Sequence, residues 1–133
     1  MTDAVLDSSS LIAILIDEPE KADFSVFVGA AEGLVISAAT LHESFCVMRN
    51  KAGKDGVRRL QILIDGLPLE ILPFDVGQLE VAKDAYAEFG RGSRHKAGLN
   101  MGDCFSYALA KTLDLPLLYK GDDFVHTDIR SAL

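Results

Sequence analysis

Acidic side chains occur at four separated places in the chain, each following a short apolar run of the kind that forms a buried strand. The acids are Asp7, Glu43, Asp103 and the adjacent pair Asp122 and Asp123. In a parallel sheet the carboxyl ends of the strands share one crevice, so we expect these carboxylates to meet. A divalent cation would balance their repulsion and lost hydration. We therefore expect metal-dependent chemistry, as in nucleases and phosphatases, where the ion activates water and balances charge on a phosphoryl group.

The chemistry of the ligands indicates which metal to expect. Carboxylate oxygens suit Mg²⁺ or Mn²⁺, whereas zinc prefers histidine and cysteine. The three histidines, His42, His95 and His126, have no zinc-like spacing. The expected cofactor is Mg²⁺ or Mn²⁺.

Some of these acids also have a simpler structural role open to them. Glu43 stands three residues after Thr40, and Asp103 stands three residues after Asn100, which is the spacing of a capping box at the start of a helix. Asp7 is harder to explain in this way, because it ends a strand that should be buried, where an unpaired carboxylate is costly. The placement of all the acids at the same ends of successive strands favours a shared site.

Two other classes of acidic active site fit the chain less well. Phosphatases with an aspartyl nucleophile need a second aspartate two positions after the first, and Ser9 stands there. Receiver domains need a phosphoacceptor aspartate at the end of a central strand, and the run 69–73 ends without one. A P-loop and a Gly-x-Ser-x-Gly elbow are also absent from the sequence.

Short apolar runs alternate with longer amphipathic ones, which is typical of an α/β domain with a parallel sheet flanked by helices. Strands are predicted at 3–7, 34–38, 69–73 and 116–119, with a weak fifth near Ile129. Helices are predicted at 9–16, 20–32, 40–52, 56–66, 75–89 and 102–113. No linker or repeat divides the chain, so one domain spanning 1–133 is expected, with a central sheet of four to five strands.

Polar residues at several boundaries predict where helices begin. Ser8, Ser9 and Ser10 offer hydroxyl caps directly after Asp7, and Asp75 can cap the helix that follows it. The apolar face of that helix is predicted to contain Leu79, Ala82, Tyr86 and Phe89.

The composition is that of an ordinary soluble domain, with 133 residues, 49% hydrophobic and 25% charged. Cys46 and Cys104 are predicted to be buried, reduced thiols, in keeping with a cytoplasmic protein. No secretory signal or membrane span is predicted.

The net charge of −7 argues against general affinity for nucleic acid. Two local basic groups oppose this trend, and each could equally be a solvated surface. They are Arg49, Lys51, Lys54, Arg58 and Arg59, and Arg91, Arg94, His95 and Lys96.

Several motifs together resemble the PIN-domain ribonucleases, and within them the VapC toxins of bacterial toxin–antitoxin modules. The most specific stretch is Gly90-Arg91-Gly92 through His95, followed by Leu99-Asn100-Met101-Gly102-Asp103-Cys104-Phe105-Ser106-Tyr107-Ala108. A second is Leu117-Leu118-Tyr119-Lys120-Gly121-Asp122-Asp123-Phe124 with Thr127-Asp128, and the opening Val5-Leu6-Asp7-Ser8-Ser9 is a weaker match. The resemblance covers nearly the whole chain.

This resemblance implies a metal-dependent endoribonuclease, often a homodimer, that a cognate antitoxin holds inactive. Asp7 and Asp103 match the principal metal ligands, Glu43 matches the acid of the second helix, and Ser8 matches a hydroxyl residue that supports the site. Asp123 fits the last acid better than Asp122, although both remain candidates for the metal.

In the expected mechanism a metal-activated water attacks the RNA phosphate in line, and Glu43 or Asp123 orients the water or accepts its proton. The basic loop of Arg91, Arg94, His95 and Lys96 would guide the RNA backbone toward the acidic site.

An antitoxin could insert an arginine among the carboxylates. It could also lay a helix on an apolar face, for which the candidates are Phe24, Phe27 and Val28 or Leu60, Leu63 and Ile64.

The alternative to a ribonuclease is a non-catalytic PIN-like binding module. Cation-dependent RNA cleavage that is lost in an Asp7 variant would separate the enzyme from the binding module.

Overall fold

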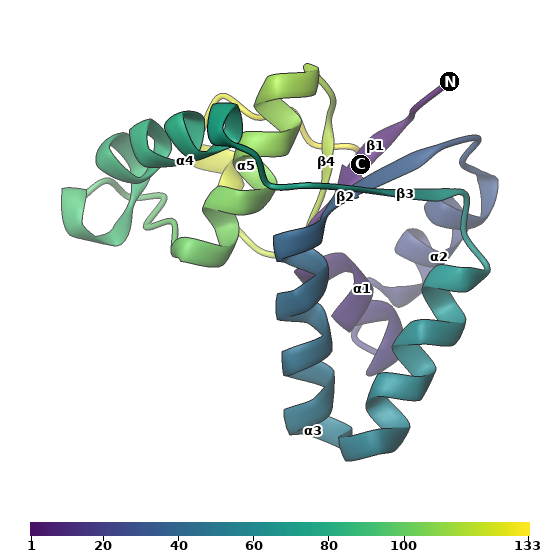
Figure 1. The fold of residues 1–133 in the computed structure, drawn as a ribbon. Coiled ribbons are helices and arrows are strands. Elements are labelled where there is room, and N and C mark those ends of the chain that lie inside the picture. The colour runs from purple at the N-terminus through teal and green to yellow at the C-terminus, as the bar shows by residue number, and fades with distance from the viewer.

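A computed structural model describes residues 1–133 in full and contains four strands and five α-helices (Figure 1). The strands are β1 (Ala4–Leu6), β2 (Leu34–Ser37), β3 (Leu69–Leu72) and β4 (Leu117–Leu118). The helices are α1 (Ser8–Leu15), α2 (Lys21–Ala30), α3 (Ala38–Asp65), α4 (Val76–Phe89) and α5 (Met101–Leu113), with short 3₁₀ helices η1 (Arg91–Ser93) and η2 (Phe124–His126). The predicted α/β class is confirmed.

The four strands form one parallel sheet in the order β3-β2-β1-β4. β1 lies between β2 and β4, with Val5 opposite Val35 on one side and Leu117 on the other. The expected fifth strand near Ile129 is reduced to a single bridge between Leu117 and Ser131. Because every strand runs the same way, all four carboxyl ends reach one edge of the sheet.

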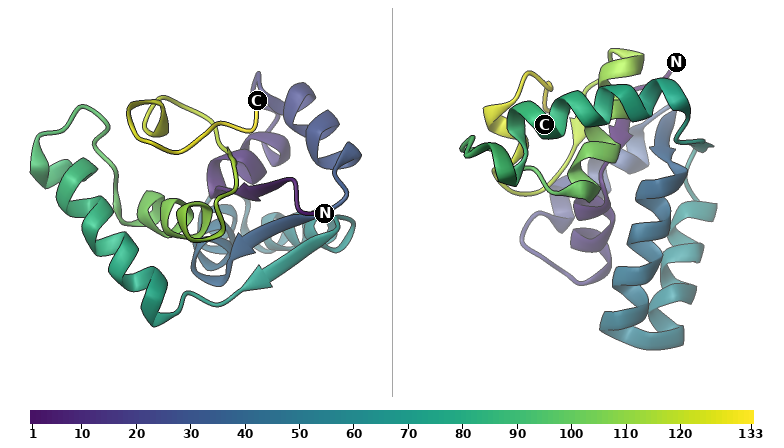
Figure 2. Two further views of the ribbon diagram at one scale, coloured as in Figure 1. Left: turned by 90° about the horizontal axis from the view of Figure 1, so that it is seen from above. Right: turned by 60° about the vertical axis from the view of Figure 1, so that its left-hand side comes forward.

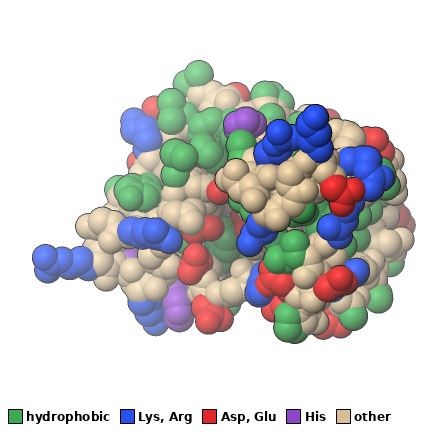
Figure 3. Space-filling model, turned by 90° about the horizontal axis from the view of Figure 1, so that it is seen from below, with side chains coloured by type: hydrophobic (Ala, Val, Ile, Leu, Met, Phe, Trp, Pro, Cys, Tyr) green, Lys and Arg blue, Asp and Glu red, His purple; other side chains and the backbone are tan.

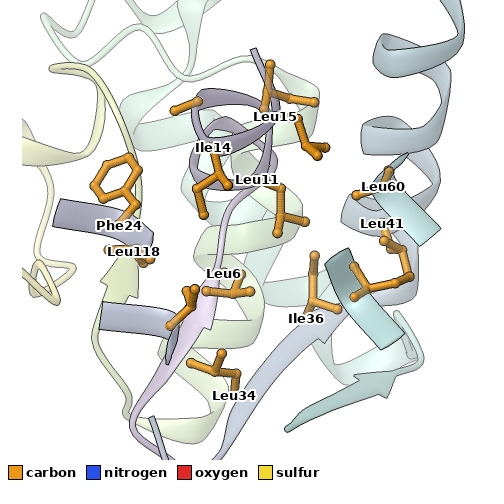
Figure 4. Close-up of a cluster of buried hydrophobic side chains, with 14 of the residues drawn as sticks. Leu6, Leu11, Ile14, Leu15, Phe24, Leu34, Ile36, Leu41, Leu60 and Leu118 are labelled. Atoms are coloured by element: carbon orange, nitrogen blue, oxygen red, sulfur yellow. The ribbon is translucent and has the colours of Figure 1, made fainter. Parts of the chain in front are cut away.

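Helices cover both faces of the sheet, so each strand alternates between two apolar clusters. Leu6 and Ile36 point toward α1, α2 and α3 (Figure 4), while Val5 and Val35 point toward α4 and α5. This double burial explains why the strand sequences read as continuous apolar runs. The two helical layers are separate in the views of Figure 2.

Helix α3 is a hairpin of two arms, which project away from the sheet in Figure 1. The chain reverses at Gly53, whose φ of 61° is a conformation that favours glycine. The predicted helices 40–52 and 56–66 correspond to these two arms. Gly56 lies directly against the Met48 carbonyl of the first arm, so the arms pack closely.

Two expectations about helix starts are wrong. Ser37 caps α3 by accepting a hydrogen bond from Ala39 N, so the predicted capping box of Thr40 and Glu43 does not form. Asp7, rather than one of the serines, caps α1. The cap at Asp75 is confirmed, because Asp75 Oδ1 accepts from Gln78 N at 2.9 Å.

Three expectations about burial also need correction. Cys46 is exposed, while Cys104 is buried as expected. Of the four residues predicted for the apolar face of α4, Ala82 and Phe89 are buried, whereas Leu79 and Tyr86 are each 44% exposed.

The apolar faces offered for a partner helix belong mainly to the core. Phe24, Val28, Leu60 and Ile64 are buried there, and Phe27 and Leu63 pack against the same cluster. None of the helices is both long and apolar enough to cross a lipid bilayer.

Candidate active site

Asp7 is the most deeply buried acid of the chain, and its position follows from the end of β1. Only 4% of its surface is exposed. Its Oδ2 accepts hydrogen bonds from Ser9 N at 3.1 Å and Ser9 Oγ at 2.5 Å, and its Oδ1 accepts from Ser106 Oγ at 2.5 Å. These bonds offset the cost of burying a carboxylate and fix its orientation.

Glu43 lies in the first arm of α3 and faces Asp7 across the edge of the sheet. Its Oε1 accepts a hydrogen bond from Ser8 Oγ at 3.1 Å. Its carboxylate also lies against Gly102 at the start of α5, where a β-carbon would overlap it. Burial raises the pKa of Glu43, and the charge of Asp7 adds to this while the bond from Ser8 opposes it.

Asp103 combines a capping role with a place beside the other acids. It forms the predicted capping box of α5, in which Asp103 N donates to Asn100 Oδ1 at 2.8 Å and Asn100 N donates to Asp103 Oδ2 at 3.0 Å. Burial raises its pKa to about 7, partly opposed by the Asn100 bond, and the charges of Asp7 and Asp123 raise it further. Capping and proximity to other acids therefore coexist in one carboxylate.

The segment after β4 brings Asp123, rather than Asp122, toward this group. Asp123 acts on Asp103 both by its charge and by hydrogen bonding. Asp122 is exposed and makes no side-chain hydrogen bond or ion pair. Lys120 N donates to Ser9 Oγ at 2.9 Å, which ties this segment to α1 and to the bonds around Asp7.

The predicted acids, except for Asp122, therefore lie around the carboxyl edge of the sheet and influence one another's pKa there. Their donor atoms are all carboxylate oxygens, the kind that hard divalent cations prefer. Burial raises the pKa of Glu43 and Asp103, the neighbouring acids add to this rise, and a bound cation would offset both the lost hydration and the repulsion. No group of three or more side chains from His, Cys, Asp and Glu is close enough to form a complete ligand set. The donor chemistry fits Mg²⁺ or Mn²⁺, while the present spacing is looser than a coordination shell.

The basic segment after α4 forms η1 and a turn at Arg94, whose φ is 63°. Arg91, Arg94 and Lys96 are exposed and form no ion pair. His95 is held inward, because its ring packs edge-on against Phe89 and its Nδ1 accepts from Ala97 N at 3.0 Å. The segment therefore presents three free cations and one structural histidine.

Three residues of the site were not identified from the sequence. Ser9 and Ser106 bind Asp7, and Gly102 makes room for Glu43. Ser106 could have been predicted from the sequence, because a residue three positions after Asp103 lies on the same face of the helix. Gly102 acts through a contact with the distant Glu43, which local patterns do not reveal. Ser9 binds Asp7 locally, but its second partner, Lys120 N, comes from a distant segment.

Comparison with known proteins shows which family the chain resembles. The PIN domain family matches residues 4–130. Ribonuclease VapC30 of Mycobacterium tuberculosis is 42% identical over 128 residues, which cover 96% of this chain and 97% of the relative. Ribonuclease VapC of Mycolicibacterium smegmatis is 40% identical and covers 96% of this chain and 98% of its own length.

Solved structures show the same fold at low sequence identity. The crystal structure of VapC20 from Mycobacterium tuberculosis, described as a sarcin-ricin loop cleaving toxin, matches with a TM-score of 0.77, 12% identity and coverage of 96% of each chain. A toxin–antitoxin complex from Klebsiella pneumoniae matches with a TM-score of 0.72, 16% identity and coverage of 98% of each chain.

Proposed function

The chain belongs to the VapC ribonucleases of the PIN-domain family, and from this premise we propose that it hydrolyses RNA phosphodiester bonds with the help of Mg²⁺ or Mn²⁺. As a VapC ribonuclease it is the endoribonuclease toxin of a toxin–antitoxin module. The dependence on a divalent cation is supported by the all-carboxylate donor set at the carboxyl edge of the sheet.

We assign the metal to Asp7, Asp103, Glu43 and Asp123, which lie at that edge. A cation held there would activate water and balance the charge on the phosphate. Ser9 and Ser106 keep the Asp7 carboxylate in one orientation, so little reorganisation is needed when substrate binds. Glu43, whose pKa is raised, is suited to accept the proton of the attacking water, and Ser8 orients it.

One observation carries the proposal: a carboxylate that is 4% exposed is held by two serine hydroxyls beside three further acids. A chain that needed only stability would avoid such a concentration of like charge around a buried carboxylate.

Asp7→Asn tests this role directly. The substitution keeps the size of the side chain but removes its charge, so we expect RNA cleavage to fall by roughly 1,000-fold or more while the fold is retained. Cleavage is followed on total RNA with Mg²⁺ or Mn²⁺, by mapping the new RNA ends, and folding by circular dichroism.

Asp122→Asn is the matched control, because Asp122, unlike Asp123, does not act on the pKa of Asp103. It should cleave like the wild type, whereas Asp123→Asn should be impaired. Full activity in Asp7→Asn would exclude this catalytic assignment. A wild-type chain that binds RNA or an antitoxin but never cleaves RNA would favour the non-catalytic module instead.

We propose two protein partners, a cognate antitoxin and a second copy of the chain. We also propose that the chain and both partners act in the cytoplasm. Two apolar depressions are available. One, about 490 Å³, lies on α2 beside Asp3 and Asp23, and it suits an antitoxin segment that carries apolar and basic side chains. The other, about 340 Å³, lies between α4 and α5 and is almost wholly apolar, which suits a second copy.

A further inference from the structure

The chain has thirteen Lys and Arg residues and twenty acids, yet many of its cations form no ion pair with an acid. Six cations form ion pairs, so seven of the thirteen do not. Of these seven, Arg59 donates to the Leu15 carbonyl. The other six are Arg49, Lys51, Lys54, Arg91, Arg94 and Lys96.

These six free cations fall into only two short segments. Arg91, Arg94 and Lys96 form the basic loop after α4. The other three, which we call the hairpin group (Arg49, Lys51 and Lys54), surround the reversal of α3 at Gly53. Every member of both groups is exposed. In a chain with an excess of acids, unpaired cations confined to two segments point to an anionic partner from outside.

The hairpin group stands on a firm support. Gly56 packs directly on the Met48 carbonyl, and Asp55, the only acid between 49 and 59, is neutralised by Arg58 at 2.6 Å. Arg49 lies six residues beyond Glu43 on the same arm, which is about 9 Å along the helix axis. The backbone that carries these cations is therefore well packed, and Arg49 is the member nearest to Glu43 along the arm.

The two groups lie on opposite sides of the site. Figure 3 looks onto the carboxyl edge of the sheet, where acidic side chains surround a hollow. Lys and Arg side chains gather to one side, on the part that carries α4 and η1, and to the other side, on the part that carries the α3 hairpin. A single-stranded nucleic acid that touches both groups must therefore cross the hollow.

We propose that the hairpin group forms the second half of the RNA-binding surface, so that the substrate backbone runs from the basic loop across the carboxylates to the tip of α3. This inference rests on the proposed ribonuclease function. Single-stranded RNA fits because its phosphates are a continuous anion that two separated cation groups can hold at once. The attraction at both ends also offsets repulsion between phosphate and the acids at the centre.

The test replaces the hairpin group by glutamine in a triple variant, Arg49→Gln, Lys51→Gln and Lys54→Gln. A matched control, Lys21→Gln, Lys83→Gln and Lys111→Gln, removes the same charge from cations that are already paired. Binding of a fluorescein-labelled, mixed-sequence single-stranded RNA is measured by anisotropy in EDTA over a range of KCl concentrations, where no cleavage occurs.

We expect the hairpin variant to bind roughly tenfold or more weakly at low salt, with the slope of log affinity against log salt reduced by about 2. The control should bind like the wild type. Equal losses in both variants, or no loss in the hairpin variant, would overturn the inference.

Two further outcomes separate this inference from the function beneath it. Cleavage by the wild type together with unchanged RNA binding by the hairpin variant would refute the inference alone. A wild type that neither binds nor cleaves RNA would refute both.

Discussion

Asp103 is the residue at which the cost of assembling the site is clearest. Its pKa is about 7 in the folded chain, against an ordinary value of 3.8. Because the folded protein holds this proton more tightly than the unfolded one, the resulting stability is fully present below about pH 3.8 and is lost as the pH rises through 7. Without a cation, the ionised site therefore destabilises the protein at neutral pH.

We predict that Asp103→Asn is more stable than the wild type above pH 7 in EDTA, by about 1–2 kcal/mol after allowance for screening of a partly exposed group. The amide oxygen can still accept the hydrogen bond from Asn100, so the capping box is preserved. Urea denaturation at a series of pH values measures the difference, which should vanish near pH 4. A difference that stays constant from pH 4 to pH 8 would contradict the proposed ionisation.

At the residue scale the sequence predicted most acids of the site but not what holds them. Asp7 and Glu43 could be named because each follows an apolar run that forms a strand, whereas the run before Asp103 forms only a bridge between Leu99 and Gly90. The preference for Asp123 over Asp122 came from the family resemblance. Ser9 could not, since its hydroxyl is defined by two partners, Asp7 and the backbone of Lys120, that no local spacing connects.

At the scale of elements, the approach of α5 to α3 decides where Glu43 lies. Gly102, at the second position of α5, allows the carboxylate of Glu43 to lie against the helix backbone. Any larger side chain at this position must displace Glu43, because the two would overlap. Packing of two helices is thus coupled to the geometry of the site.

We predict that Gly102→Ala lowers RNA cleavage by roughly 100-fold, because a misplaced catalytic group costs about this much. Gly29→Ala on α2 is the control, since an added β-carbon there meets nothing within 4 Å. The control should retain activity and gain about 0.5–1 kcal/mol from better helix propensity. Cleavage assays and urea denaturation report both effects, and an unimpaired Gly102→Ala would show that Glu43 is not held by this contact.

The elements themselves were largely predictable, and the errors have physical causes. Thr40 and Glu43 have capping-box spacing, yet Ser37 lies one turn earlier and caps the helix first. Thr40 is then fully buried, and its hydroxyl lies 3.4 Å from that of Ser106. Glu43 is released from capping and turns toward Ser8. The capping-box spacing of Thr40 and Glu43 was therefore overridden by the cap at Ser37, and this leaves Glu43 available for the site.

At the scale of the whole molecule, the apolar surface between α4 and α5 stands out. Leu79 and Tyr86 are each 44% exposed and Met101 is 71% exposed, around a depression that Phe74 and Phe105 also line. A surface of this kind is self-complementary when two copies meet about a two-fold axis. Met101 directly precedes Gly102 and Asp103, so a second copy bound here would lie beside the site.

We therefore predict that the wild type behaves in solution as a dimer of the 14.4 kDa chain, and that Leu79→Ser with Tyr86→Ser yields a monomer. Each side chain is 44% exposed, so burying the remainder contributes roughly 1 kcal/mol on one copy and the same on its partner, and the loss of all four should dissociate the pair. Light scattering coupled to size exclusion measures the mass. Val26→Ser, which alters the depression on α2 and not this one, should remain dimeric. A double variant that stays dimeric would place the interface on another face, and the surface between α4 and α5 would then need a different partner to cover it.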